Sequence, residues 1–210
     1  MMMTAQKEVP KLHALTYAQD DASLVAGLRA GHVDAGTVFY NRYVSHVQRI
    51  ITRVMGVDSE LADITSEVFF QSLRSIDTLN DPTRLKAWVT RIAVFTSRKW
   101  IRKRKRNNWL RILPAEEIPE AAAREPEPKE SSAARAVREI INRMPPDERV
   151  VFSLRFLEQM QIAEIADACG YSLRTAKRRL AQCERRFKRM AESDPDIAGW
   201  LEASAKWRNR

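Results

Sequence analysis

The sequence predicts an all-α protein: two small helical domains joined by a flexible, acidic, Pro-rich linker, the second domain containing a helix-turn-helix. Only six glycines occur in 210 residues, and residue types that favour helices are abundant. Apolar residues recur three and four positions apart, whereas strand-like alternation is nowhere longer than four residues. Residues 114–130 interrupt this pattern with four prolines and six acidic residues, which is typical of a linker.

The net charge of +9 favours a polyanionic partner, either nucleic acid or an anionic membrane surface. No run of apolar residues approaches the ~20 that span a bilayer. The N-terminus also lacks the basic and apolar regions of a secretory signal. We therefore expect a soluble, cytoplasmic protein without membrane insertion.

The first two helices are predicted over residues 21–30 and 35–55. Leu24, Val25 and Leu28 fall on one side of the first helix. Asp34 is expected to cap the second helix, and Gly56 to end it. The second helix carries a dense core-forming face: Val38, Phe39, Tyr43, Val47, Ile50, Ile51 and Val54.

A third helix is predicted over residues 58–76, starting at Asp58. Its apolar stripe is expected to consist of Leu61, Ile64, Val68, Leu73 and Ile76, with Phe69 beside it. The other side carries Asp63, Ser66, Glu67, Phe70 and Gln71. Phe70 among acidic and amide groups indicates either a protein-docking face or a single exposed apolar residue without a role.

A fourth helix is predicted over residues 83–106, because Asn80-Asp81-Pro82 combines a capping side chain with a proline in the first turn. Leu85, Trp88 and Val89 begin its inward face, which ends at Thr96. Residues 98–106 then hold seven cations in nine positions, with Trp100 inside the run and Trp109 beyond it. This run is either a solvated tail or, as we expect, a ridge that follows phosphates while tryptophans stack on unpaired bases.

The second domain is predicted to begin near Ser131, with one helix ending at Met144-Pro145-Pro146 and another opening at Asp147. Residues 161–189 then read as a helix-turn-helix. Gly170 supplies the turn and Ser172 the N-cap of the second helix. On that helix one face is apolar (Leu173, Ala176, Leu180, Cys183, Phe187) and the opposite face is cationic (Arg174, Arg178, Gln182, Arg185, Arg189). The alternative is a helical hairpin with a solvated basic face.

The two cysteines, Cys169 and Cys183, both lie on apolar stripes of this motif. We expect buried free thiols rather than a disulfide or a metal site. The three histidines show no ligand spacing, and no catalytic constellation is present in the sequence. The protein is therefore predicted to be neither an enzyme nor dependent on a cofactor or metal.

Residues 21–189 resemble the bacterial extracytoplasmic-function sigma factors, the small two-domain specificity subunits of RNA polymerase. LVAGLRAGHVDAGTVFYNRY and ADITSEVFFQSL resemble sigma region 2, the second being similar to the helix that docks on the polymerase clamp. KAWVTRIAVFTSRKWIRKRKR resembles the helix that opens and reads the −10 element. MPPDERVVFSLRFLEQMQIAEIADACGYSLRTAKRRLAQCERRFK resembles the −35-binding segment of region 4.

The resemblance implies three sets of site residues. Core polymerase binding falls on Asp63, Ser66, Glu67 and Phe70, where Ser66 replaces a usual glutamine. The −35 contacts fall on Arg174, Thr175, Lys177, Arg178, Gln182 and Arg185. The −10 contacts fall on Lys86, Trp88, Arg91, Arg98, Lys99 and Arg102. Phe95 and Lys99 replace an asparagine and an aspartate usual in the family, which leaves the −10 base preference open.

The resemblance also implies the domain boundaries and the partners. The expected parts are an N-terminal extension (1–20), a region 2-like domain (21–112), a linker (113–132), a region 4-like domain (133–191) and a C-terminal tail with a short helix (192–210). The expected partners are core RNA polymerase and promoter DNA, bound as a monomer, with an anti-sigma factor left open. The rival functions are a stand-alone helix-turn-helix transcriptional regulator, a nucleic-acid-processing enzyme and an anti-sigma-like interaction protein.

Overall fold

The structure is a computed structural model that describes residues 17, 20–56, 59–110 and 132–193, with side chains described outside 105–110 and 132–133. Helices and short helical turns make up all of its regular secondary structure within these ranges, which confirms the all-α prediction. The chain groups into two compact units. The first holds residues up to Ser97 together with Ala166–Tyr171, and the second holds Arg98–Ile165 and the residues from Ser172 onward.

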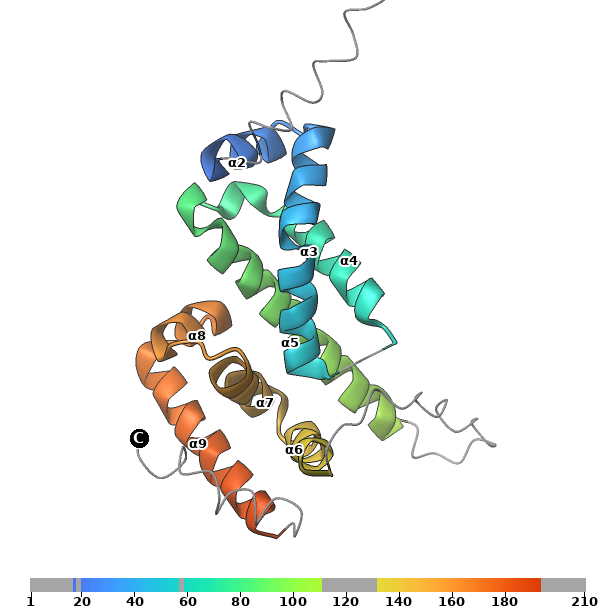
Figure 1. Ribbon diagram of the computed structural model, residues 1–210, viewed down its shortest axis with the longest axis vertical. Coiled ribbons are helices and arrows are strands. Elements are labelled where there is room, and N and C mark those ends of the chain that lie inside the picture. The colour runs from blue at the N-terminus through green and yellow to red at the C-terminus, as the bar shows by residue number, and fades with distance from the viewer. Residues whose placement is uncertain (1–16, 18–19, 57–58, 111–131, 194–210) are drawn as a thin grey trace, which may run out of the picture. The chain divides into compact units, whose positions relative to one another are not determined.

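In the first unit, α2 (Asp21–Arg29) packs against the long helix α3 (Val33–Met55) (Figure 1). Gly27 lies at their contact, where a Cβ would come within 2.8 Å of the Ala35 Cβ and of the Tyr17 ring. Leu24, Val25 and Leu28 are buried as predicted. The absence of a side chain at Gly27 therefore allows the two helices to approach closely.

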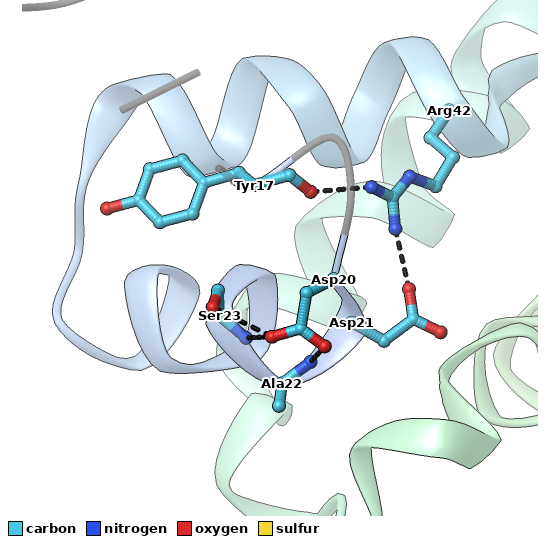
Figure 2. Close-up of polar contacts among 6 residues, drawn as sticks. All are labelled: Tyr17, Asp20, Asp21, Ala22, Ser23 and Arg42. Carbon is cyan, nitrogen blue, oxygen red and sulfur yellow. Dashed lines mark hydrogen bonds and ion pairs between the residues drawn. The ribbon is translucent and has the colours of Figure 1, made fainter. Parts of the chain in front are cut away.

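Polar contacts hold the start of α2 in place, as Figure 2 shows. The Asp20 carboxylate accepts hydrogen bonds from the backbone N–H groups of Ala22 and Ser23, at 3.2 and 2.8 Å, and so caps the helix. The Ser23 hydroxyl also donates to the Asp20 carboxylate, at 2.7 Å. This hydrogen bond, followed by the two backbone bonds, lowers the pKa of Asp20. Arg42 of α3 donates to the Asp21 carboxylate at 2.6 Å and to the Tyr17 carbonyl at 2.5 Å.

α3 also packs against α4 (Leu61–Arg74) (Figure 1). Aromatic rings form part of the contact between them. The Phe39 ring lies 5.3 Å from the Phe69 ring in an edge-to-face arrangement, and 5.4 Å from the Tyr43 ring. Both phenylalanines are buried. Such a cluster contributes large apolar area and favourable ring geometry to the core.

Three local predictions in this unit were wrong. α3 begins at Val33 with His32 at the N-cap, so Asp34 lies inside the first turn instead of capping it. α4 runs from Leu61 to Arg74 rather than over 58–76, and Ile76 belongs to a separate 3₁₀ turn, η1 (Ile76–Thr78). Leu73 is 47% exposed because nine positions, or two and a half helical turns, separate it from the buried Ile64.

α5 (Leu85–Leu110) follows the 3₁₀ turn η2 (Pro82–Arg84) and extends four residues beyond the predicted end at 106. The Asp81 carboxylate accepts from the Thr83 N–H at 3.0 Å, as its predicted capping role requires. Leu85, Val89 and Ala93 are buried as predicted, whereas Trp88, which was also predicted to face inward, is half-buried.

In the second unit, α9 (Leu173–Glu192) packs against α6 (Ser132–Arg143) and α7 (Pro146–Phe152) (Figure 1). The rings of Phe152 and Phe187 stack at 4.7 Å, both almost fully buried. α7 continues into a π-helical turn, η3 (Ser153–Leu157), for which the sequence carries no local signal. The turn is followed by Gln159, the only non-glycine residue with positive φ among the described residues.

The helix-turn-helix is present as predicted. α8 (Ile162–Cys169) is followed by Gly170, whose φ of +67° favours glycine, and by Ser172, which caps α9. Leu173 is the exception to the predicted apolar face: it is the first residue of α9 and its side chain is 46% exposed.

The linker prediction (113–132) lies almost wholly outside the described residues, as do the predicted N-terminal extension (1–20) and C-terminal tail (192–210) apart from their inner ends. Among the described residues, no helix is both long and apolar enough to cross a bilayer.

Candidate nucleic-acid and polymerase interfaces

The predicted −35-reading residues lie along one side of α9. Arg174, Lys177, Arg178 and Arg185 are exposed, while Thr175 and Gln182 are half-buried. The Ser172 hydroxyl accepts from the Thr175 N–H at 3.2 Å and lies 2.9 Å from the Thr175 hydroxyl. The cap therefore fixes the first turn of α9, where the exposed cations begin.

Two further arginines of α9 point toward its own unit, which the predicted cationic face did not include. Arg179 and Arg186 lie seven positions apart, hence on one side of the helix. The Arg186 guanidinium donates to the Glu148 carboxylate at 2.6 Å, and a terminal guanidinium nitrogen of Arg179 lies 3.4 Å from an Asp147 carboxylate oxygen. Arg179, which is half-buried, and Arg186, which is exposed, thus fasten α9 to the acidic first turn of α7.

Asp147 is the centre of a cluster of charges within the second unit. Arg98 and Arg102 each donate to its carboxylate, at 2.9 and 3.0 Å, in addition to the Arg179 contact. Burial alone would raise the pKa of Asp147, but the Arg98 hydrogen bond and the three guanidinium charges outweigh it and lower the pKa. The carboxylate is therefore held in its ionised form.

The six predicted −10 residues do not share one face of α5. Arg91, Lys99 and Arg102 are exposed, whereas Arg98 is only 8% exposed. Trp88 is half-buried, and its indole N–H donates to the Thr78 hydroxyl at 3.4 Å. Lys86 is also exposed, but it lies on the opposite side of the helix from Arg91 and Lys99.

Phe95, which the predicted −10 set did not include, lies on the same side of α5 as Arg91 and Lys99. Phe95 lies four positions from each of them and is 67% exposed. The sequence had marked Phe95 only as a replacement for the family's usual asparagine. Its spacing of four residues from two cations is the signal that would have added it to the predicted set.

The predicted polymerase-docking residues occupy one side of α4. Asp63 and Ser66 are exposed, and Glu67 is half-buried and accepts from the Gln71 amide at 2.9 Å. Phe70 is 54% exposed, with the Arg74 guanidinium 5.6 Å from its ring centroid.

The apolar surface near these residues is larger than predicted. Leu73 on α4 is 47% exposed, and Tyr40 on α3, whose ring lies 4.7 Å from that of Phe69, is 45% exposed. An apolar area beside two carboxylates is suited to binding a protein surface of mixed character.

Both cysteines are buried free thiols, which confirms the prediction. Burial raises the pKa of Cys183 to about 12, so that its thiol stays protonated and unreactive at neutral pH. Within the described residues no group of His, Cys, Asp and Glu is arranged to hold a metal ion.

Two family models match the chain. The model for Sigma-70 region 2 matches residues 39–107, which include α4 and most of α5, and the model for Sigma-70 region 4 matches residues 134–186, which include α8 and most of α9.

Curated relatives extend this similarity over most of the chain. The RNA polymerase sigma-E factor of Streptomyces avermitilis is 32% identical over 133 residues, which span 63% of this chain and 71% of that protein. The ECF RNA polymerase sigma-E factor of Haemophilus influenzae is 24% identical over 169 residues, 76% of this chain and 89% of that protein.

Solved structures share the fold. The sigma factor RpoE of Bartonella quintana, solved in complex with the anti-sigma factor NepR, superposes with a TM-score of 0.55 at 17% identity, covering 74% of this chain and 95% of that one. CnrH, solved in complex with the cytosolic domain of CnrY, gives a TM-score of 0.53 at 18% identity, covering 83% and 98%.

Proposed function

Because the chain belongs to the extracytoplasmic-function family of RNA polymerase sigma factors, we propose that its described surfaces divide the steps of promoter recognition among them. As a member, the protein binds core RNA polymerase and directs transcription initiation at a subset of bacterial promoters. The proposal assigns the parts: residues 21–112 act as the region 2 domain, residues 133–191 as the region 4 domain, and 113–132 as the linker between them.

α9 is the proposed reader of the −35 element. Its exposed Arg174, Lys177 and Arg178 occupy the first turns of a capped helix, the part that enters the major groove in helix-turn-helix proteins. Arginine side chains there bond to base edges or to phosphates. Thr175, Gln182 and Arg185 complete the proposed contact.

α5 is the proposed contact for the −10 region. Exposed Arg91, Lys99 and Arg102 supply charge for the phosphates of a melted strand. Arg98 is held by Asp147 in this structure, so its participation requires that the ion pair be exchanged for phosphate. Lys86 and Trp88 complete the proposed set.

The α4 surface of Asp63, Ser66, Glu67 and Phe70 is the proposed docking site for core polymerase. The observation that carries this assignment is an exposed aromatic ring beside carboxylates, on the helix that the region 2 model covers. Ser66 donates to the Ala62 carbonyl at 2.9 Å.

The test is binding of core RNA polymerase by an Asp63→Arg, Glu67→Arg double variant. Reversing two charges at the docking surface is expected to weaken binding at least tenfold, because like charges across an interface cost several kcal/mol. Fluorescence anisotropy of labelled protein titrated with core polymerase measures this.

The control is an Asp77→Arg, Glu139→Arg variant, which changes net charge equally at exposed carboxylates that lie on η1 and α6. Wild-type affinity is expected for it. If the two double variants bind core polymerase equally well, α4 is not the docking surface; if the unaltered chain does not bind, the sigma-factor function itself is wrong.

The remaining assignments follow from the family. We place the activity in the bacterial cytoplasm, without an enzymatic step, with the chain acting as one copy on polymerase. Because the two fold neighbours were solved with an anti-sigma factor and with the cytosolic domain of CnrY, an anti-sigma partner is proposed for this chain as well. A stand-alone helix-turn-helix regulator would not account for the region 2 match.

A further inference from the structure

The strongest feature outside the predicted sites is the cluster of charges around Asp147. The Arg98 Nε atom donates to one oxygen of the carboxylate at 2.9 Å, and a terminal guanidinium nitrogen of Arg102 donates to the same oxygen at 3.0 Å. A terminal guanidinium nitrogen of Arg179 lies 3.4 Å from the other oxygen. All four residues belong to the second unit. Asp147 therefore holds two of the cations that the proposed −10 contact requires.

The Asp147 carboxylate and a DNA phosphate require the same partners. Both are anions that accept charge-assisted hydrogen bonds from guanidinium groups through two oxygens. A guanidinium that is committed to Asp147 has fewer donors to offer to DNA, so the two anions compete for Arg98 and Arg102. Because Asp147 is part of the same chain, it competes at a high effective concentration.

The two arginines differ in how readily DNA reaches them. The Arg102 side chain is 61% exposed, whereas the side chains of Arg98 and Asp147 are only 10% and 21% exposed. A phosphate can therefore approach Arg102 while the carboxylate is in place, but it reaches Arg98 only after the carboxylate gives way. Exchange is favoured when a neighbouring exposed cation such as Lys99 binds the same strand, because linked phosphates then act together.

We propose that Asp147 is an internal competitor of DNA: it binds Arg98 and Arg102 in the chain alone and releases them to phosphates when α5 binds promoter DNA. The proposal rests on the proposed role of α5 and adds a regulation of that role. The ion pairs lower the affinity of the unassisted chain for arbitrary DNA. Full affinity is reached only where other contacts already hold a strand against α5.

The test compares Asp147→Asn with the unaltered full-length chain, without polymerase, on a fluorescein-labelled, mixed-sequence DNA strand. Asparagine keeps the size of the side chain and removes its charge. Binding is expected to tighten roughly 3- to 30-fold, because one or two ion pairs no longer oppose it. The plot of log affinity against log salt should become steeper by about 0.7 for each phosphate newly neutralised. Fluorescence anisotropy at several salt concentrations measures both quantities.

Glu139→Gln is the matched control. It raises the net charge by the same amount as Asp147→Asn, at a carboxylate that lies 3.9 Å from Arg143 of its own helix. This variant is expected to bind the strand as the unaltered chain does. Circular dichroism confirms that each variant is folded.

Arg102→Gln gives a second readout that does not depend on altering Asp147. In the otherwise unaltered chain it should lower the salt slope by less than Lys99→Gln does, because Lys99 is an exposed cation outside the cluster. In the Asp147→Asn chain it should reverse part of the gain in affinity.

Three results overturn the inference: an affinity for Asp147→Asn no higher than that of Glu139→Gln, a gain without a steeper salt dependence, or an equal loss of slope for Arg102→Gln and Lys99→Gln in the otherwise unaltered chain. Core polymerase binding is measured with the same preparations. If Asp147→Asn gains affinity for DNA but the chain does not bind polymerase, the proposed function fails and the competition stands. If the chain binds polymerase and Asp147→Asn shows no gain, only the competition fails.

Discussion

At the scale of single residues, two glycines on neighbouring helices have opposite environments. A Cβ at Gly27 would lie 2.8 Å from the Ala35 Cβ, whereas one at Gly36 would have no atom within 4 Å. We expect Gly27→Ala to lower the free energy of unfolding by about 1–3 kcal/mol through overpacking. Urea denaturation followed by circular dichroism measures the change.

Gly36→Ala is the matched control. It gives α3 the better helix former without a clash and is expected to raise the free energy of unfolding by roughly 0.5–1 kcal/mol. If both variants are stabilised, the packing of α2 on α3 at Gly27 is looser than described.

Residue-level prediction from the sequence succeeded where periodicity alone decides burial. Cys183 and Phe187 fall on the predicted stripe of α9 and are buried. It failed for Leu73, although counting helical turns from Ile64 would have placed that side chain outside. The pairing of Arg98 with Asp147 could not be predicted, because the two residues are 49 positions apart and only the folded chain brings them together.

At the scale of elements, the acidic first turn of α7 fastens α9 through Asp147 and Glu148. The lowered pKa of Asp147 means that the folded state binds its proton less readily than the unfolded chain does. Its contribution to stability is therefore present above the unfolded pKa of about 3.9 and is lost as the pH falls through the folded value. We expect the stability of Asp147→Asn to vary less with pH than wild type below about pH 5.

Urea denaturation at several pH values between about 6 and 2 checks this, with Glu192→Gln as the control. Glu192 lies 3.7 Å from Lys188 on the exposed side of α9. Parallel pH profiles for wild type and Asp147→Asn would show that the arginines around Asp147 do not stabilise the folded chain through this carboxylate.

Helix existence was predictable, and helix ends were less so. Gly56 and Asp81 act at helix ends as expected, because a glycine after a helix and an Asp-Pro before one are strong local signals. The start of α4 was misplaced, because Asp58 is a capping type of residue whereas Glu60 stands at the N-cap. The π-helical turn after α7 has no local signal. Packing of Phe152 against Phe156 and Phe187, rather than local preference, accompanies that turn.

For the molecule as a whole, the net charge of +9 predicts DNA binding that weakens steeply with salt. Replacing Arg174, Lys177 and Arg178 together with glutamine should make the plot of log affinity against log salt shallower by about 0.9 for each phosphate that the variant no longer neutralises. Anisotropy titrations of a short mixed-sequence duplex at several salt concentrations measure the slope.

Arg143→Gln is the control, because it removes a cation of α6 that lies 3.9 Å from Glu139. An unchanged slope in the triple variant would mean that these three side chains do not neutralise phosphates. A smaller affinity with an unchanged slope would instead assign them to base edges.

The sequence predicted a region 2-like part followed by a region 4-like part, and the two family models match the chain in that order. The predicted linker between them lies almost wholly outside the described residues. For the DNA-binding and polymerase-binding sites, the sequence predicted which types of residue take part but not how each side chain is placed. Which cations are exposed and which are paired within the fold depends on neighbours distant in sequence, as Arg179 and Arg186 show.

The packing of α2 on α3 and of α3 on α4 has a consequence for how quickly the first unit forms. Each of these helices meets the next one along the chain, so little loop-closure entropy is given up before neighbouring helices begin to pack. Helical proteins dominated by such local packing reach the native state in microseconds to milliseconds. The α2–α4 segment is accordingly expected to fold on that timescale.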